Sequence, residues 1–325
     1  MEQLRWGIVG PGCIAHKFAK AITNVADAEL VAVASRSESR ALDFAERYHI
    51  PRTFFSYEEL ANSDAVDAVY IATPHPFHLP CAELFLSAGK HVLCEKPLCV
   101  TARQAEKLKT IAERHRCFLM EAMWTRFLPA IQEVVRIVQA GVIGEVMGIR
   151  ADFCYAQAPE EEPKLYQNHM AGGSLLDVGV YGLHFADLFL GVPKQVQASA
   201  WLQDGIDVHT SMILSYQTGA VAEISSAIGL EKPCVAWIYG TRGKVEVPNF
   251  YGAQEFLLHT ADGVKRVQHP SIGDGFEEEI IEACNCIREG RIESEKLPLA
   301  KTITILEQMD EIRTTIGVSY PCEEC

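Results

Sequence analysis

The arrangement of apolar and polar residues changes character near residue 122. Before that point, short apolar runs alternate with segments whose apolar residues recur every three or four positions, the spacing typical of amphipathic helices. The apolar runs predict strands at residues 4–10, 28–35, 53–55, 66–73, 90–95 and 117–121, and the periodic segments predict helices at 13–22, 39–48, 56–61, 78–89 and 102–115. Strict alternation indicates parallel strands joined by right-handed crossovers, and therefore a doubly wound Rossmann sheet in an α/β fold.

Beyond residue 122 the strands become longer and their side chains alternate between apolar and polar. This pattern is typical of antiparallel sheets that bury one face, and glycines in "QTGA" and "GTRGK" suit hairpin turns. We expect an α+β domain with an open, mostly antiparallel sheet of five or six strands. The expected strand segments are 146–156, 195–203, 208–228, 234–249 and 255–260, with helices near 127–140, 275–289 and 299–316. The sequence therefore predicts two domains, residues 1–122 and 123–325.

Composition excludes several classes of partner. The chain has 325 residues, 48% hydrophobic and 22% charged, and a formal charge of −14. That charge argues against binding to a nucleic acid or to an anionic membrane surface. No apolar stretch is long enough to span a membrane, and the opening "MEQLRWGIVGPG" lacks the features of a signal peptide. We therefore expect a cytoplasmic protein.

Eleven cysteines are scattered along the chain, an odd number. Cys94, Cys117 and Cys154 fall in core segments, where reduced, buried thiols are the ordinary interpretation. Cys322 and Cys325, in the terminal "CEEC", have the spacing of half a redox or metal site. Because no second pair or histidine cluster accompanies them, we predict no metal site, and their role stays open.

A glycine-rich turn follows the first predicted strand. Residues 10–15 read "GPGCIA", which matches the G-x-G-x-x-A pattern between a strand and a helix. Gly10 permits the tight turn, Gly12 lets the backbone approach a pyrophosphate, and Ala15 lets the helix pack closely on the strand. Together with Cys13 and Ile14, this turn is predicted to bind a dinucleotide.

The tip of the second strand distinguishes between the two nicotinamide cofactors. An NAD site usually places Asp or Glu there, whereas this strand ends in Ser35 and Arg36. A carboxylate would repel a 2′-phosphate. Ser35 can donate to it, and Arg36, joined by Arg40 one turn later, can bind it in bidentate fashion. NADP is therefore favoured over NAD, with a solvated surface arginine as the alternative.

Two further strand tips carry candidate ligands of the cofactor. The loop "TPHPFH" follows the fourth strand, and the pair Glu95–Lys96 follows the fifth, directly before a proline. In a parallel sheet covered on both faces, ligands bind at the carboxyl ends of the strands. The expected contacts are Thr73, Pro74, His75, His78, Glu95 and Lys96.

Residues 172–184, "GGSLLDVGVYGLH", offer the groups that hydroxyl chemistry needs. Asp177 and Tyr181 are four residues apart, so a helix would place them on one face. Transfer of hydride from a carbinol requires a group that takes the hydroxyl proton. A phenol is a weak acid at neutral pH, but a nearby ammonium such as that of Lys96 favours the phenolate. The alternative interpretation is that Tyr181 is an ordinary helix residue.

The glycine turn, "CEKP" at 94–97 and "GGSLLDVGVY" at 172–181 together resemble the glucose–fructose oxidoreductase/inositol dehydrogenase (Gfo/Idh/MocA) family. "MEAMWTRFLP" and "IGVSYP" are most similar to the branch of dimeric dihydrodiol dehydrogenases and NADP-dependent D-xylose dehydrogenases. The resemblance implies a catalytic lysine at Lys96, an acid/base tyrosine at Tyr181 and the family aspartate at Asp177. It also implies that Trp124 and Arg126 face the substrate pocket. Tyrosine rather than histidine at position 181 argues against inositol as the substrate.

The expected activity is NADP-dependent oxidation or reduction of a sugar or vicinal-diol hydroxyl. The resemblance implies that residues 123–325 bind substrate and form a homodimer through the open sheet. A non-catalytic NAD(P)-binding sensor of the same fold is the alternative, and its mark would be loss of the lysine or the tyrosine. Both residues are present.

Overall fold

The structure, a computed structural model, describes residues 3–324, so Cys325 of the terminal cysteine pair lies outside the described residues. The chain divides into two compact units, which are described separately. The first contains the chain up to Cys99, Arg103–Trp124 and Ile272–Ile303, and the second contains Val100–Ala102, Thr125–Ser271 and the chain from Thr304 onward.

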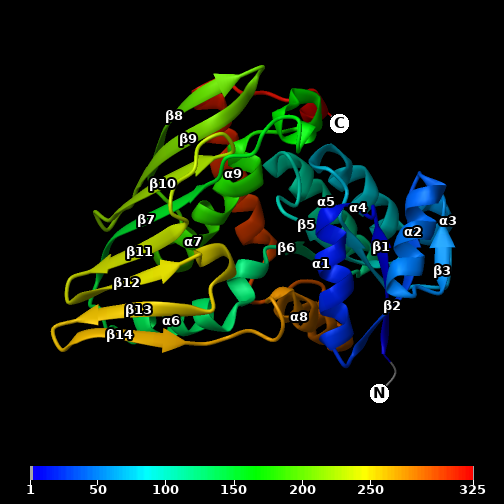
Figure 1. The fold of residues 1–325 in the computed structure, drawn as a ribbon, viewed down its shortest axis with the longest axis horizontal. Helices are drawn as coiled ribbons and strands as arrows, with labels where there is room; N and C mark the ends of the chain where they lie inside the picture. The colour runs from blue at the N-terminus through cyan, green and yellow to red at the C-terminus, as the bar shows by residue number, and fades with distance from the viewer. Residues whose placement is uncertain (1–2, 325) are drawn as a thin grey trace. The chain divides into compact units, whose positions relative to one another are not determined.

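The first unit is built on a parallel sheet with, among the described residues, six strands in the order β3-β2-β1-β4-β5-β6 (Figure 1). This order is that of a doubly wound dinucleotide-binding sheet, and it confirms the predicted fold class. The strands are β1 (Leu4–Val9), β2 (Ala28–Ala34), β3 (Arg52–Phe54), β4 (Ala68–Ile71), β5 (His91–Glu95) and β6 (Leu119–Ala122).

Amphipathic helices cover this sheet. In α1, Ala15, Phe18 and Ala19 recur at helical spacing and are buried, and the Phe18 ring stacks on Tyr70 of β4 with centroids 4.0 Å apart. The helices of this unit are α1 (Cys13–Ala21), α2 (Glu38–Tyr48), α3 (Tyr57–Ala61), α4 (His78–Ser87), α5 (Ala102–His115) and α8 (Phe276–Arg288).

The two units are not separated by a single cut in the sequence. The sequence predicts one boundary, after residue 122, but Ile272–Ile303 belongs to the first unit. Leu119 donates its backbone N–H to the carbonyl oxygen of Ile292, with an N···O distance of 3.0 Å. This distance is typical of backbone hydrogen bonds. The hydroxyl of Thr302 donates to Glu121 Oε2, also at 3.0 Å. A segment distant in sequence therefore extends the first unit beyond β6.

The second unit contains a mostly antiparallel sheet, as expected, but with more strands than the five or six predicted. Its described strands number eight, in the order β14-β13-β12-β11-β7-β10-β9-β8, and only β7 and β10 are parallel neighbours. The strands are β7 (Val146–Cys154), β8 (Gln195–Gln203), β9 (Ile206–Ser215), β10 (Val221–Ala227), β11 (Val235–Gly240), β12 (Gly243–Pro248), β13 (Glu255–Thr260) and β14 (Gly263–Gln268). The sequence analysis missed β14, because this edge strand is polar and mostly exposed.

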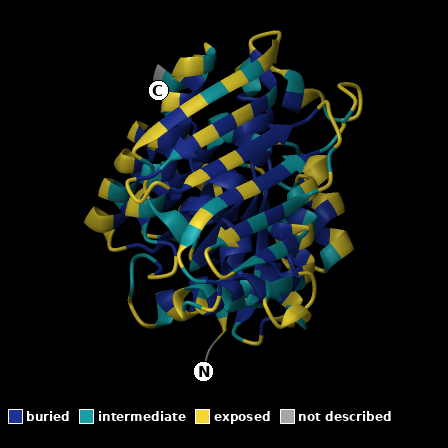
Figure 2. Ribbon diagram, turned by 90° about the vertical axis from the view of Figure 1, so that its left-hand side faces the viewer, coloured by how far each residue is buried: buried dark blue, intermediate teal, exposed yellow. Residues whose placement is uncertain are grey.

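One face of this sheet is packed and the other is open. Helices α6 (Pro129–Gln139) and α7 (Val180–Leu190) pack against the inner face, and the last helix is α9 (Leu299–Ile316). Figure 2 shows exposed and buried residues alternating along the strands on the open side. Trp201, Ile213 and Tyr239 share this outer register and are 58%, 46% and 39% exposed.

Candidate active site

The glycine turn of the first unit connects β1 to α1 at the carboxyl edge of the parallel sheet. Gly10 has φ +85°, and a Cβ atom there would lie 3.0 Å from Thr73 Cγ2 and 3.3 Å from Thr73 N. Gly12 is the N-cap residue of α1, and it has no side chain that could cap this helix start. Cys13 is exposed. An uncapped helix N-terminus reached through a close glycine turn suits the phosphates of a dinucleotide.

The tip of β2 carries a cation where other dinucleotide sites carry an acid. Ser35 is buried, and its hydroxyl accepts a hydrogen bond of 3.1 Å from the N–H of Ser37. The exposed Arg36 guanidinium lies over the Phe77 ring, 4.9 Å from its centroid. Arg40 is exposed on the first turns of α2. These residues fit a phosphorylated ribose, because they offer donors and positive charge, and the nearest acid, Glu38, lies beyond the strand tip on α2.

The two histidines of the loop after β4 have adjacent rings, with centroids 5.7 Å apart, but they differ in burial. Thr73 is buried, whereas Pro74 and His75 are half-buried at the sheet edge. His78 is fully buried; its Nδ1 lies 2.9 Å from the Pro97 carbonyl oxygen and its Nε2 lies 2.7 Å from that of Thr73. Burial lowers the pKa of His78. We therefore infer that His78 connects two strand-tip loops, rather than contacting a cofactor through its ring.

The loop that carries Lys96 is held at three backbone positions. Glu95 Oε2 accepts from the N–H of Lys96 at 3.2 Å, and Glu121 Oε1 accepts from that of Leu98 at 3.1 Å. In the third contact, the Pro97 carbonyl oxygen lies 2.9 Å from His78 Nδ1. The Glu95 carboxylate thus turns back to the backbone of the loop that follows it. Because Lys96 follows directly from β5, this arrangement fixes where its side chain leaves the sheet edge.

Three carboxyl groups are buried beneath this loop. Glu95 also accepts from the Tyr70 hydroxyl, and burial raises the pKa of both groups. Glu279, from α8, is completely buried, and neither of its oxygens has a hydrogen-bond partner among the described residues. Burial, together with Glu95 and Glu121, raises the pKa of Glu279 well above its usual value. A neutral carboxylic acid is therefore the form that fits this position.

Trp124 is the last residue of Arg103–Trp124, the second of the three segments that form the first unit. It is 5% exposed, its ring centroid lies 4.8 Å from that of Phe276, and the Lys17 ammonium lies over both rings at 5.4 and 5.3 Å. The expectation that Trp124 faces a substrate pocket stays a prediction.

In the second unit, the "GGSLLDVGVYGLH" segment forms a π-helical turn, Leu175–Gly179, that continues into α7. Gly173 has φ +113°, and a Cβ atom there would lie 2.3 Å from Asp207 Oδ1. Asp207 is fully buried on β9 and accepts from Ser174 Oγ, Leu175 N and Thr210 Oγ1, each at 2.7 Å. Isolated π-turns are frequent at functional sites. This carboxylate therefore fixes the start of the helix that bears Asp177 and Tyr181.

Asp177 lies in the π-helical turn and Tyr181 in the first turn of α7, and both have aromatic neighbours. Their place on one helix face stays a prediction. The Tyr181 ring lies 5.3 Å from Phe153 and 6.1 Å from Tyr251, and Phe153 stacks on Tyr251 at 4.4 Å. Asp177 Oδ2 accepts a hydrogen bond of 2.5 Å from the Tyr155 hydroxyl. A carboxylate and a phenol bordered by apolar rings suit a small polyol or cyclic diol.

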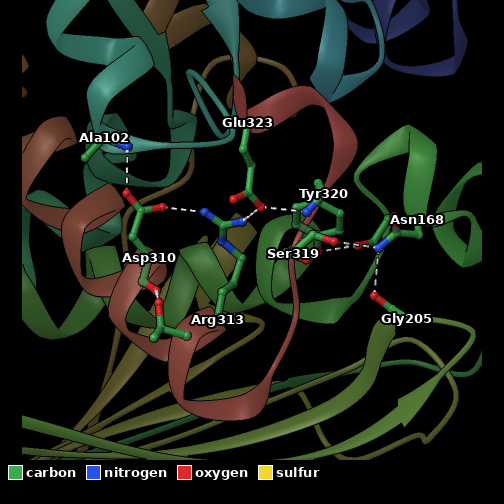
Figure 3. A network of polar contacts seen from close by, with 10 residues as sticks. Ala102, Asn168, Gly205, Asp310, Arg313, Ser319, Tyr320 and Glu323 are labelled. Carbon is green, nitrogen blue, oxygen red and sulfur yellow. Dashed lines mark hydrogen bonds and ion pairs between the residues drawn. The ribbon is translucent and has the colours of Figure 1, made fainter. Parts of the chain in front are cut away.

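The carboxyl-terminal segment supports the same helix start (Figure 3). Tyr320 donates its hydroxyl to the Gly172 carbonyl oxygen at 2.6 Å, and its N–H to Glu323. The buried Arg313 guanidinium contacts both Glu323 and Asp310. Asp310 in turn accepts from the N–H of Ala102 at 3.0 Å.

Arg126, expected at the substrate pocket, forms a buried ion pair. Its guanidinium lies 3.0 Å from Asp187 Oδ2 and 3.3 Å from the His184 ring, both on α7, and the residue is 5% exposed. This geometry favours a role in holding α7. The pocket assignment of Arg126 therefore stays an untested prediction.

The predicted residues divide between the units. The first contains the glycine turn, Ser35, Arg36 and Lys96; the second contains Asp177 and Tyr181. Asp207, Tyr155 and the aromatic neighbours were not found from sequence. An acid inside the apolar run "GIDVHT" signals a buried carboxylate, but nothing in the sequence names its partners.

Within residues 3–324, no group of three or more His, Cys, Asp or Glu side chains is arranged to hold a metal ion. No helix in the same residues combines the length and apolar character that crossing a membrane requires.

Comparisons with known proteins agree along the whole chain. Residues 4–123 match the GFO_IDH_MocA model, described as "oxidoreductase family, NAD-binding Rossmann fold", and residues 131–246 match the GFO/IDH/MocA C-terminal domain. A trans-1,2-dihydrobenzene-1,2-diol dehydrogenase of Danio rerio is 35% identical over 329 residues, covering 98% of each chain. The Homo sapiens enzyme of that name is 33% identical over 331 residues, again covering 98% of each.

A solved structure extends the comparison. A 3-ketoreductase from Actinomadura kijaniata, in complex with NADP and TDP-benzene, has a TM-score of 0.88 and 26% identity, covering 98% of this chain and 99% of that one. Other structures of the same enzyme carry a tyrosine-to-phenylalanine or a lysine-to-alanine substitution.

Proposed function

Because the chain belongs to the GFO/IDH/MocA oxidoreductase family, we propose that it is an NADP-dependent dehydrogenase of sugar or vicinal-diol hydroxyls. The observation that carries this proposal is the position of Lys96. Lys96 lies at the carboxyl edge of the parallel sheet, the edge that also carries the glycine turn. The turn follows β1 and Lys96 follows β5, with β4 between these two strands. The Lys96 loop is held by hydrogen bonds at three backbone positions.

The residues present fit NADP. The N–H groups at the start of α1 and the Gly10–Gly12 turn would hold the pyrophosphate. Arg36, with Ser35 and Arg40, would hold the 2′-phosphate, because no acid is present at the β2 tip to repel it. The further contacts proposed at the edge are Cys13, Ile14, Thr73, Pro74, His75 and Lys96. Bound NADP would supply the hydride acceptor or donor.

Side chains of the protein itself transfer the proton of the reacting hydroxyl. Tyr181 takes it from the reacting hydroxyl and returns it in the opposite direction. The positive charge of Lys96 favours the phenolate form of Tyr181, and Asp177 orients the substrate through a hydroxyl. Support comes from the relatives: two are dehydrogenases of a vicinal diol, and one was studied with substitutions of a lysine and a tyrosine.

A substrate screen with two variants tests this function. NADP⁺ reduction is followed with D-xylose, D-glucose, myo-inositol and a trans-dihydrodiol, with NADPH binding measured by fluorescence. Lys96→Met and Tyr181→Phe are each expected to lower kcat by about a hundredfold or more while leaving NADPH binding largely intact. Lys90→Met is the matched control, because Lys90 precedes the opposite end of β5 and donates to the Val66 carbonyl.

The outcomes of the screen are distinct. Near-normal turnover by Lys96→Met would remove the proposed role of this lysine. NADPH binding by the unchanged protein, without turnover of any of the compounds, would instead support the non-catalytic sensor.

We further propose that the open face of the second unit's sheet forms a homodimer. Large exposed apolar side chains on one sheet face mark an interaction surface, and Trp201, Ile213 and Tyr239 provide them here. Ile213→Glu is expected to shift the protein toward monomer in analytical ultracentrifugation. Val192→Glu, at a 59% exposed position outside the strands, is the control. Unchanged sedimentation of the Ile213 variant would count against this interface.

A further inference from the structure

Two tyrosines adjoin the Asp177 turn, and they differ in their surroundings. Tyr155 follows the end of β7, and its backbone N–H donates to the Ala227 carbonyl of β10 at 3.0 Å. Its hydroxyl donates to Asp177 Oδ2 at 2.5 Å. Tyr181 instead lies on α7 against the rings of Phe153 and Tyr251. The sheet thus holds Asp177 through Tyr155, while Tyr181 belongs to the same helical segment as Asp177.

Tyr155 has the properties of a permanent hydrogen-bond donor. Burial raises the pKa of Tyr155, and the neighbouring Asp177 carboxylate raises it further. The phenol therefore keeps its proton throughout the working pH range and is unsuited to exchanging protons with a substrate. A neutral phenol donating to a carboxylate forms a charge-assisted hydrogen bond, which is shorter and stronger than a neutral one.

We propose that Tyr155 is a positioning residue that holds the Asp177 carboxylate to recognise a second hydroxyl group, so that the site selects vicinal diols over simple alcohols. This inference rests on the function proposed above. In a vicinal diol, one hydroxyl reacts at Tyr181 while its neighbour donates to Asp177. A carboxylate fixed before binding loses less rotational freedom when the diol arrives, so its orientation contributes to affinity.

Selectivity follows from the surroundings of the carboxylate. The rings of Phe153, Tyr181 and Tyr251 provide apolar contacts that any cyclic alcohol can make. Only a substrate with a second hydroxyl can also donate to Asp177. A site built to hydrogen-bond a hydroxyl discriminates against the analogue that lacks it, because its polar group then loses its partner.

The test compares trans-cyclohexane-1,2-diol with cyclohexanol, using NADP⁺ and the full chain. Tyr155→Phe is expected to raise KM for the diol by about tenfold, the effect of one lost positioning hydrogen bond, and to leave kcat within about twofold. KM for cyclohexanol should not change. Asp177→Asn should also raise KM for the diol, and adding Tyr155→Phe to it should have no further effect, because both substitutions remove one interaction.

Tyr166→Phe is the matched control. The Tyr166 hydroxyl donates to the carbonyl oxygens of Gln157 and Ile228, at 2.7 and 3.0 Å, in the same part of the unit. Its loss disturbs the local scaffold without touching Asp177. An equal rise in KM for diol and cyclohexanol, or an equal effect of Tyr166→Phe, would mean that Tyr155 is merely structural and would overturn the proposal.

A binding measurement separates this inference from the proposed function. If the unchanged protein turns over neither alcohol, the proposed dehydrogenase activity on these compounds fails, and saturation-transfer NMR of the diol decides the role of Tyr155. Weaker diol binding in Tyr155→Phe than in the unchanged protein and in Tyr166→Phe supports positioning. Equal binding in all three, or no diol binding to the unchanged protein, rejects it.

Discussion

The hydroxyl of Tyr320 donates a hydrogen bond of 2.6 Å to the carbonyl oxygen of Gly172. Gly172 directly precedes Gly173 and Ser174, where the π-turn begins, so this contact connects the carboxyl-terminal segment with the start of the helix that bears Tyr181. The donor is 4% exposed, and water therefore cannot readily replace it.

Tyr320→Phe removes this donor and keeps the ring. The buried Gly172 carbonyl then loses a partner, and we expect the free energy of unfolding to fall by about 1–2 kcal/mol. Urea denaturation measures the change. Thr314→Ala is the control, because its exposed hydroxyl donates to the Asp310 carbonyl on the same helix. A stability loss no larger than that of the control would show that the contact contributes little.

Asp207 is expected to be the more sensitive support of the same turn. Asp207→Ala removes the acceptor that Ser174, Leu175 and Thr210 share, at a cost of about 2–4 kcal/mol. Of these donors, the Ser174 hydroxyl keeps a second acceptor, the Ser226 carbonyl oxygen. Asp207→Asn retains one acceptor oxygen and should lose less. Thermal unfolding of the two variants checks this order, and the reverse order would contradict it.

Glu279 should make stability depend on pH in a defined direction. Burial and the carboxyls of Glu95 and Glu121 raise the folded-state pKa of Glu279, whereas the unfolded chain releases this proton at the ordinary value. Folding therefore takes up a proton, and the contribution of this group to stability falls as pH rises above the unfolded value. Glu279→Gln removes that dependence, so its stability advantage over the unchanged protein should grow between pH 5 and pH 8.

Urea midpoints at several pH values within that window test the sign. Glu311→Gln, at an exposed position on α9, is the control and should give a difference that does not vary with pH. An advantage of Glu279→Gln that stays constant or shrinks with rising pH would show that Glu279 is ionised in the folded protein.

The sequence predicted the parallel sheet well, because its signals are local. Apolar runs, helical spacing and the turn at Gly10 all act within one strand–helix unit, and β1 to β6 appear where they were expected. The placement of Ile272–Ile303 in the first unit was not predicted. It depends on pairing between segments far apart in the chain, such as Leu119 with Ile292, which periodicity does not encode.

In the candidate site, too, features that depend on local spacing were predicted and contacts between distant segments were not. Asp177 and Tyr181 could be paired from sequence because four residues separate them on a helix. Tyr155 could not be paired with Asp177, since the contact depends on how β7 packs against the π-turn. For His78, the position after a strand was predicted from the sequence, but the contacts of its ring were not. The ring is buried, and its two nitrogens face backbone carbonyl oxygens.

Arg36 is expected to determine cofactor preference. Arg36→Ala removes the cation at the β2 tip, and we expect the Kd for NADP⁺ to rise by about ten- to a hundredfold, the value of a charge-assisted contact. NAD⁺ lacks the 2′-phosphate, so its Kd should change by no more than about twofold. Arg47→Ala, on α2 over the Tyr48 ring, is the control. Equal weakening of both cofactors would mean that Arg36 binds a feature they share.

Substitution of Arg126 tests whether this residue stabilises the fold or contacts the substrate. Arg126→Met leaves the Asp187 carboxylate buried without its guanidinium partner, 3.0 Å away in the intact protein, and should cost about 3–5 kcal/mol of unfolding free energy. Replacing Asp187 by Leu in the same chain removes the stranded charge and should restore most of that stability. Thermal unfolding and substrate KM are measured together for both variants. A raised KM with unchanged unfolding would instead identify Arg126 as a pocket residue, because loss of a substrate contact does not require loss of stability.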